Sequence, residues 1–332
     1  MISKASIAQL FFSGFPEGID ASTLRSRHFP HGIGGLVHFS RNVNNADQLS
    51  KLNAALQLEF GADTSEAGQL PLAIGVDQEG GRVQRIKAPV CKAWPAAATC
   101  DESGAHAVGA GIGQELKSMG FNFDFAPVLD VVNNTENTVI GDRSYAADPE
   151  QVARCAISYA RGLQASGILS CGKHFPGHGG PVADSHHEVP VDERALDELM
   201  QSDLTPFFAA AEYALPMLMT AHVRYPKIDA DNVATYSSSI MNELLRDKMG
   251  YTGVLITDDL DMAASVETTG TLEQAAEKAL LAGCDALLVC HSYDRVTALI
   301  EHLQTRANQD TRLFKRIHTA YNRLKTYYRL LS

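Results

Sequence analysis

The sequence has few cysteines and no long apolar segment. Its six cysteines are scattered over 332 residues without a CxxC pair, and Cys155, Cys171 and Cys290 stand in apolar surroundings. This usage is typical of small core residues in a reducing compartment, so we expect no structural disulfide. No apolar run approaches the roughly 20 residues that span a bilayer, and no charged-then-apolar signal segment opens the chain. We therefore expect a cytoplasmic protein without a membrane-bound part.

Positive charge is also scarce. The chain carries 28 Lys and Arg against 39 Asp and Glu, a formal net charge of −11, with a pI near 5.5. Nucleic acids and anionic membranes are bound through clustered Lys and Arg. The composition argues against both and favours a small-molecule partner.

A domain linker is missing too, since no Pro/Ser-rich stretch or run of like charges divides the chain. We expect one domain over residues 1–332 and, as a separate expectation, a monomer. Eight short apolar, β-branched runs alternate with segments of helical spacing, which is typical of repeated βα units. The expected strands are Ala8 to Phe15, Gly35 to Phe39, Leu72 to Val76, Phe121 to Pro127, Gly167 to His174, Met217 to Ala221, Gly253 to Thr257 and Ala286 to Cys290. The count predicts an α/β fold, a TIM-like (β/α)8 barrel, although the first two runs also suit antiparallel or irregular segments.

Apolar positions at i, i+3, i+4 and i+7 predict helices around this barrel. The expected outer helices are Asp47 to Phe60, Gly104 to Met119, Asp148 to Ala165, Leu196 to Tyr213, Ser238 to Met249 and Leu272 to Ala282. A last helix over Arg312 to Leu331 has one apolar face, which predicts packing on the barrel rather than on a membrane or a partner.

Conspicuous polar residues follow the predicted strands, where a (β/α)8 barrel carries its catalytic groups. The stretch LAIGVDQEGGRVQR closes a strand with Asp77 and continues through a Gly-Gly pair to Arg85. The Gly-Gly pair is a weak phosphate signal, because Asp77 and Glu79 would repel an anion. The stretches FDFAPVLDVVNN and VIGDRSY add Asp130 and Arg143.

A nearly all-apolar strand in GVLITDDLDMAA delivers Asp258 and Asp259 at its end. Neighbouring side chains alternate along a strand, so only one of the two can point into the barrel mouth. A carboxylate there suits a nucleophile or an anchor for a developing cation. The alternative is that both acids cap the following helix.

The densest polar stretch is KHFPGHGGPVADSHHEV, which begins with Lys173 and His174 at a strand end. Asp184 and His186 are two residues apart, so in an extended segment the carboxylate can orient and charge the imidazole. This pair is a candidate acid/base dyad. The three glycines of this stretch predict hinge freedom and a loop that closes over a substrate.

A metal site is the alternative for this stretch, because its four histidines could ligate zinc. Their spacing lacks the HxxxH arrangement of a helix, and the intervening prolines and glycines would make a loose chelate, so we favour the acid/base role. Two further residues are expected to be structural: His222 as a hydrogen-bonded barrel histidine and Trp94 as a packing residue.

Six motifs together resemble glycoside hydrolase family 3, and within it the single-domain bacterial β-N-acetylglucosaminidases of the NagZ type. They are IGVDQEGGRVQR, APVLDV, IGDRSY, KHFPGHG followed by DSH, LMTAHV and TDDLDM, in the family's order. The loop GHGGPVADSHH is less polar than is usual in the family, and HFSRNVNNADQL is a variant of its LFTRN region. Neither difference removes a catalytic residue.

The resemblance implies a retaining exo-hydrolase for terminal β-linked N-acetylglucosamine, with no cofactor and no metal. The implied substrate is a cell-wall fragment with 1,6-anhydro-N-acetylmuramic acid, with or without peptide. Asp258 matches the nucleophile, His186 the general acid/base and Asp184 its partner. The implied substrate-binding residues are Asp77, Arg85, Arg143, Lys173 and His174. The alternatives are a metal-dependent TIM-barrel hydrolase, a family 3 β-glycosidase of other sugar specificity, and a non-catalytic sugar-binding protein, which would not need a strand-end nucleophile.

Overall fold

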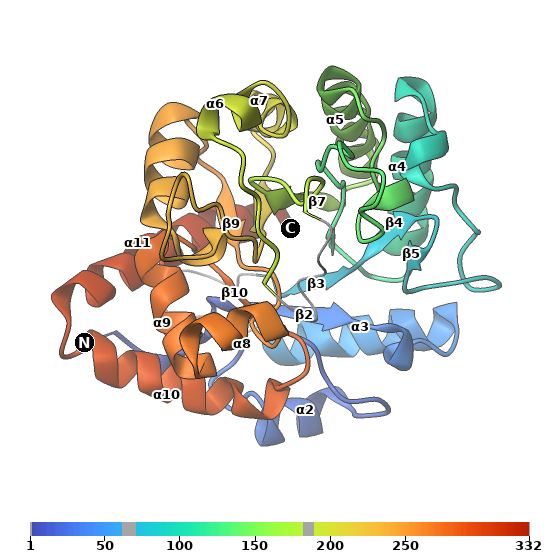
Figure 1. Ribbon diagram of the computed structural model, residues 1–332. Helices are drawn as coiled ribbons and strands as arrows, with labels where there is room; N and C mark the ends of the chain where they lie inside the picture. The colour runs from blue at the N-terminus through green and yellow to red at the C-terminus, as the bar shows by residue number, and fades with distance from the viewer. Residues whose placement is uncertain (1, 62–70, 182–188, 332) are drawn as a thin grey trace.

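A parallel eight-stranded sheet forms the centre of the molecule. The computed structural model describes residues 2–61, 71–181 and 189–331. Its large sheet has the order β10-β1-β2-β3-β6-β7-β8-β9, and every neighbouring pair is parallel. A parallel bridge between Ile256 and Ala286 brings the two ends of this order together (Figure 1). The predicted TIM-like barrel is confirmed.

Each of the eight predicted apolar runs contains one strand. The strands are β1 Phe11–Ser13, β2 Gly35–His38, β3 Ala73–Val76, β6 Phe123–Asp124, β7 Leu169–Phe175, β8 Met217–Thr220, β9 Val254–Ile256 and β10 Leu287–Val289. The alternative of antiparallel or irregular first strands is wrong, because β1 and β2 pair in parallel with Phe12 opposite Gly35. A small antiparallel hairpin, β4 (Gln78–Gly80) and β5 (Val83–Gln84), follows β3 and was not predicted.

Helices surround the barrel, and α4 and α5 lie side by side in Figure 1. The described helices are α1 Lys4–Ala8, α2 Ala21–Arg27, α3 Ala46–Phe60, α4 Glu102–Ser118, α5 Pro149–Ala165, α6 Leu196–Met200, α7 Thr205–Glu212, the π-helix η5 Ser239–Lys248, α8 Ala263–Thr269, α9 Leu272–Ala282, α10 Val296–Ala307 and α11 Thr311–Tyr328. Among them, no helix is both long enough and apolar enough to cross a bilayer.

The predicted helix from Leu196 to Tyr213 is in fact two helices. The chain leaves the helical path between α6 and α7, and Asp203 in this break is buried against Arg194, with Arg194 Nη1 2.6 Å from Asp203 Oδ2. Pro206 then stands in the first turn of α7, where its missing N–H is tolerated. The break in the helical periodicity therefore coincides with an ion pair whose carboxylate is buried.

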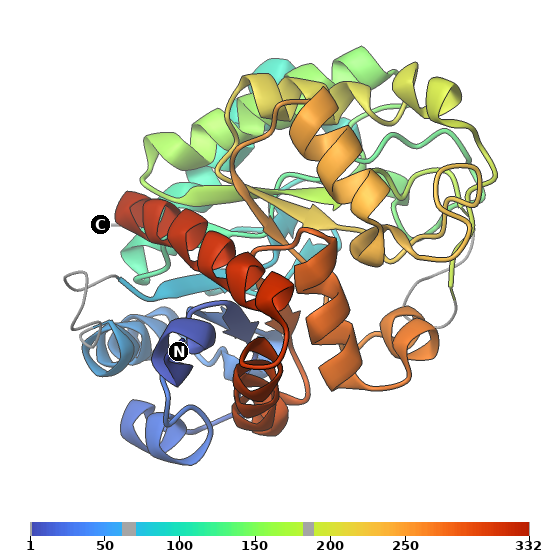
Figure 2. The same cartoon turned by 90° about the vertical axis from the view of Figure 1, so that its left-hand side faces the viewer.

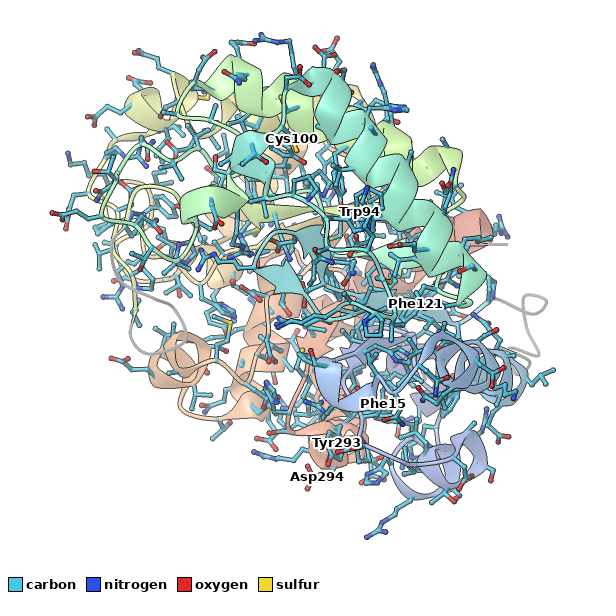
Figure 3. All side chains as sticks on the ribbon, turned by 90° about the vertical axis from the view of Figure 1, so that its right-hand side faces the viewer. Phe15, Trp94, Cys100, Phe121, Tyr293 and Asp294 are labelled. Atoms are coloured by element: carbon cyan, nitrogen blue, oxygen red, sulfur yellow. The ribbon has the colours of Figure 1, made fainter. Side chains whose placement is uncertain are left out.

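Aromatic side chains fill the space between the strands and the outer helices. Phe15 and Phe121, labelled in Figure 3, pack edge-on against His38 with ring centroids 5.0 and 4.8 Å away. Burial lowers the pKa of His38 to about 4, so this imidazole is neutral at physiological pH. Trp94 packs against α4 and donates its Nε1 hydrogen to Glu115 at 2.8 Å, which confirms its predicted packing role.

The end of the barrel where β9 and β10 begin is held by a buried carboxylate. Asp285 is fully buried, and its oxygens lie 2.6 to 2.8 Å from the guanidinium nitrogens of Arg246, Arg316 and Arg323. Two of these arginines belong to α11, which runs beside α9 and α10 (Figure 2). The last helix is therefore tied to the barrel by charge as well as by its apolar face.

Candidate active site

The carboxyl ends of the strands surround a cavity of about 610 Å³. The six predicted site residues that the structure describes all line it. They are Asp77, Arg85, Arg143, Lys173, His174 and Asp258. Residues separated by up to 181 positions in sequence thus meet at the end of the barrel that carries catalytic groups in this fold.

Five charged residues form one wall of the cavity, which we call the charged wall: Asp77, Glu79, Arg85, Arg143 and Lys173. Lys173 lies at its centre. It is 2% exposed, and its Nζ atom is 2.8 Å from Asp77 Oδ1 and 2.7 Å from Glu79 Oε1. The register between β7 and β8 shifts between Gly172 and Phe175, so Lys173 and the next residue sit in an irregular part of the strand. Burial lowers the pKa of Lys173, but the two carboxylates outweigh burial and hold the pKa above its ordinary value. The ammonium is therefore charged.

Glu79 joins Lys173 to Arg143. The Arg143 guanidinium binds the Glu79 carboxylate through two nitrogens, at 2.9 and 2.8 Å. Burial raises the pKa of Glu79, but the two cations hold it well below its usual range. The same balance, with Lys173 and Arg85 as the cations, lowers the pKa of Asp77. The wall is a network of fixed charges whose geometry is set before any ligand binds.

Arg85 is the least satisfied cation of this wall. Its only described ion pair is a long one, 3.4 Å from Nη2 to Asp77 Oδ2, and its buried Nε has no hydrogen-bond partner among the described residues. The guanidinium lies over the Phe39 ring, 5.7 Å from the centroid. Arg85 therefore presents hydrogen-bond donors that a ligand could use.

Asp258 follows β9 and is half-buried at the cavity. Its Oδ1 accepts a hydrogen bond from the Asp259 amide at 2.8 Å, and its own amide donates to Thr220 at 3.4 Å. His222 donates from Nε2 to the Asp259 carbonyl at 3.1 Å, and its Nδ1 lies 2.8 Å from the Thr235 hydroxyl oxygen. The prediction that His222 is a hydrogen-bonded barrel histidine is confirmed.

Asp259 lines the same cavity as Asp258, so the prediction that only one of the two acids faces the barrel mouth is not confirmed, but the two carboxylates make different hydrogen bonds. Asp259 Oδ1 accepts from the amides of Cys290 at 3.0 Å and Asp261 at 3.1 Å, so it fastens the loop after β9 to the loop after β10. Burial raises the pKa of Asp259 to about 7, and the nearby Asp261 carboxylate adds to this effect. The helix-cap alternative for both acids is wrong, because α8 begins four residues after Asp259 and neither side chain caps it.

His186 and Asp184 lie outside the described residues, and so does His187. The stretch before them is described, and its glycines are tightly packed. Gly177 accepts a hydrogen bond from the Tyr225 hydroxyl, and a Cβ on Gly179 would lie 1.7 Å from the Val131 carbonyl oxygen. Gly177 has a φ of 144° and Gly179 has no room for a side chain, so both positions require glycine, and loop closure stays a prediction.

Two buried acids contribute to the site although no role was predicted for them. Glu79 was noted only as repelling anions, and Asp130 only as a polar residue after a strand. Asp130 is fully buried beside His174, with its Oδ2 2.7 Å from Nδ1 of the imidazole. Both acids are in recognised motifs, but only the fold reveals their partners. Among the described residues, no group of three or more His, Cys, Asp or Glu side chains is arranged to hold a metal ion.

Comparison with known proteins agrees with this geometry. Residues 7–324 match the Glycosyl hydrolase family 3 N terminal domain. A beta-hexosaminidase of Bordetella avium is 39% identical over 281 residues, which are 82% of this chain and 77% of that protein. The chain belongs to glycosyl hydrolase family 3. It is an enzyme of the β-hexosaminidase type, as predicted.

Solved structures extend the likeness to the fold. NagZ from Neisseria gonorrhoeae, in complex with N-trifluoroacetyl-D-glucosamine, superposes with a TM-score of 0.79 at 34% identity, covering 88% of this chain and 84% of that one. A family 3 beta-N-acetylglucosaminidase from Paenibacillus sp. gives a TM-score of 0.88 at 34% identity, and this chain spans 64% of its length.

Proposed function

We propose that the protein is a retaining exo-β-N-acetylglucosaminidase. Its substrates would be peptidoglycan fragments in which N-acetylglucosamine is linked to 1,6-anhydro-N-acetylmuramic acid, with or without peptide, during cell-wall recycling in the cytoplasm. The observation that carries the proposal is the half-buried Asp258 carboxylate in the same cavity as the network of Asp77, Glu79, Lys173 and Arg143. We further propose that residues 1–332 act as a monomeric catalytic unit.

The reaction would proceed in two displacements. In the first, an Asp258 oxygen attacks the anomeric carbon while His186 gives its proton to the leaving sugar oxygen, so a glycosyl-aspartate forms and the glycosidic bond breaks. In the second, His186 takes a proton from water, which displaces Asp258 and restores the starting state. Asp184 would orient the imidazole and stabilise its charged form. An imidazole suits both steps, because its ordinary pKa of about 6.5 is close to neutral pH.

The charged wall would hold the sugar in reacting geometry. Lys173, Arg85, Asp77 and Arg143 can bind hydroxyl groups, and His174 adds one ring nitrogen. Because the ion pairs are already formed, a sugar would meet fixed dipoles rather than side chains that must first be ordered. Binding energy would then be available for the chemical step.

A turnover assay tests this proposal against its alternatives. We expect an aryl β-N-acetylglucosaminide to be hydrolysed much faster than the matching aryl β-glucoside, with equal rates with and without EDTA. A preference for the glucoside would reassign the sugar specificity. Loss of activity in EDTA that zinc restores would favour a metal-dependent hydrolase, and no turnover of either substrate would favour a binding protein. Proton NMR of the first-formed sugar distinguishes retention from inversion.

A further inference from the structure

Asp130 forms hydrogen bonds with His174 and His178 of the site but does not itself line the cavity. It is fully buried. Its Oδ2 lies 2.7 Å from His174 Nδ1, and its Oδ1 lies 2.7 Å from the His178 amide nitrogen and 3.3 Å from that of His174. One carboxylate therefore fixes an imidazole and the backbone on both sides of the Phe175–Gly177 segment.

These contacts determine where the imidazole carries its hydrogen. Backbone N–H groups can only donate, so two donors converge on Asp130 Oδ1 and stabilise the ionised carboxylate. A carboxylate can only accept, so Nδ1 of His174 must be the donor. Within the described part of the chain the only hydrogen bond of the His174 ring is the one at Nδ1, and His174 lines the cavity.

We propose that Asp130 is a positioning residue: it fixes His174 as the Nδ1–H tautomer, so that Nε2 accepts a hydrogen bond from a hydroxyl group of the bound sugar. The inference rests on the proposed function for the identity of the sugar. It assigns His174 the part of an acceptor beside Lys173 and Arg143, which can only donate. With the Asp77 carboxylate, His174 would then accept hydroxyl hydrogens, while the cations donate to hydroxyl oxygens.

The tautomer can be measured in the wild-type protein, without relying on any variant. Selective 15N labelling of histidine, with the His174 signals assigned by their loss in His174→Gln, reports which ring nitrogen carries hydrogen. At pH 8 and without ligand we expect a protonated Nδ1 and a non-protonated Nε2. A hydrogen on Nε2, from the other tautomer or from an imidazolium, overturns the proposal. Added N-acetylglucosamine should shift the Nε2 resonance, and an unchanged Nε2 in the saturated complex also overturns it.

The variant Asp130→Asn tests the consequence for catalysis. Its carbonyl oxygen can still accept from the two amides, but its NH₂ group would donate to Nδ1 and so place the imidazole hydrogen on Nε2. We expect kcat/KM for an aryl β-N-acetylglucosaminide to fall about 10- to 100-fold, the size of one mispaired buried hydrogen bond. The matched control is Asp124→Asn, another fully buried acid, bonded to the Gln78 amide and to no imidazole, which should leave the His174 tautomer unchanged.

A double-mutant cycle separates positioning from a purely structural role. If Asp130 acts through His174, Asp130→Asn should cost less than about twofold in a His174→Ala background. An equal cost in both backgrounds would mean that Asp130 supports the backbone only, and would overturn the proposal. A protein with the expected tautomer that hydrolyses no β-N-acetylglucosaminide would refute the proposed function and still support the action of Asp130 on His174.

Discussion

Lys173 Nζ lies 2.7 Å from Glu79 Oε1, and the same carboxylate binds Arg143 through two nitrogens. All three side chains are largely buried. Removing one partner of a buried ion pair leaves the other charge without compensation, which costs more than the pair contributes. Glu79 therefore holds two cations in the wall of the site, although the sequence motif gave it no such role.

Replacing Glu79 with Gln should lower the free energy of unfolding at pH 7 by about 3 to 5 kcal/mol, because Lys173 and Arg143 lose their shared counter-charge. Urea unfolding measures the change. Asp142→Asn is the control, since it breaks the exposed Arg82–Asp142 pair and should cost at most about 1 kcal/mol. The folded-state pKa of Glu79 is depressed, so its contribution is present above the unfolded value of about 4.3 and is lost as pH falls below it. The gap between wild type and variant should narrow in acid, and a constant gap would contradict this account.

Asp259 should show the opposite dependence on pH. Its folded-state pKa is raised to about 7, so its contribution to stability is full below the unfolded value of about 3.9 and is lost as pH rises to about 7. The loss amounts to roughly 4 kcal/mol for the isolated group. Asp259→Asn keeps the acceptor for the Cys290 and Asp261 amides but cannot titrate. The free energy of unfolding, measured at pH 5, 6 and 7.5, should therefore decrease less with rising pH for the variant than for the wild type. An equal decrease in both proteins would show that Asp259 does not titrate in this range.

Asp258→Ala should abolish turnover while sugar binding stays measurable, because it removes a group used in the chemical step and leaves the ion-paired wall intact. Calorimetry with N-acetylglucosamine and a turnover assay provide the two readouts. In the wild-type enzyme, a 2-deoxy-2-fluoro or 5-fluoro glycoside should label Asp258. Mass-spectrometric mapping of the label to Asp259 or Glu79 would refute the assignment.

His186→Ala should separate the two half-reactions. An activated nitrophenolate leaves without a proton, so glycosylation should survive with aryl substrates far better than with sugar leaving groups. The second step still needs a base, so we expect a burst of phenolate and rescue by azide. Asp184→Ala should be a weaker version, within the roughly 10²- to 10⁴-fold range of general acid/base effects. Equal impairment on both leaving groups, without burst or rescue, would direct the search to His174 or Glu79.

Much of the barrel could be predicted because buried parallel strands read as apolar runs. Four helices were missed. The helices α1, α2 and α8 have at most seven residues, too few for a clear period, whereas α10 buries apolar residues at helical spacing and could have been predicted. The segment Ala8 to Phe15 was expected to be one strand, but its first residue ends α1 and only Phe11–Ser13 pairs. Local propensity reports an element's interior better than its ends.

The site was predictable residue by residue but not pair by pair. Motifs identified Asp77, Lys173 and Asp258, because strand ends mark where catalytic groups gather. The bonds of Glu79 to Lys173 and of Asp130 to His174 join residues 94 and 44 positions apart, and no local spacing encodes them. Such partners follow from which strands become neighbours, so they emerge only with the fold.

The pairing of β1 with β10 has a consequence for how the chain is made. Phe12 faces Leu288, so one edge of β1 waits for a partner that is synthesised 276 residues later (288 − 12). At translation rates of about 5 to 20 residues per second, that wait lasts roughly 15 to 55 s. During this time the nascent chain exposes an unpaired strand edge, which is a template for association with other chains. Association between nascent copies is therefore favoured until β10 emerges and covers this edge.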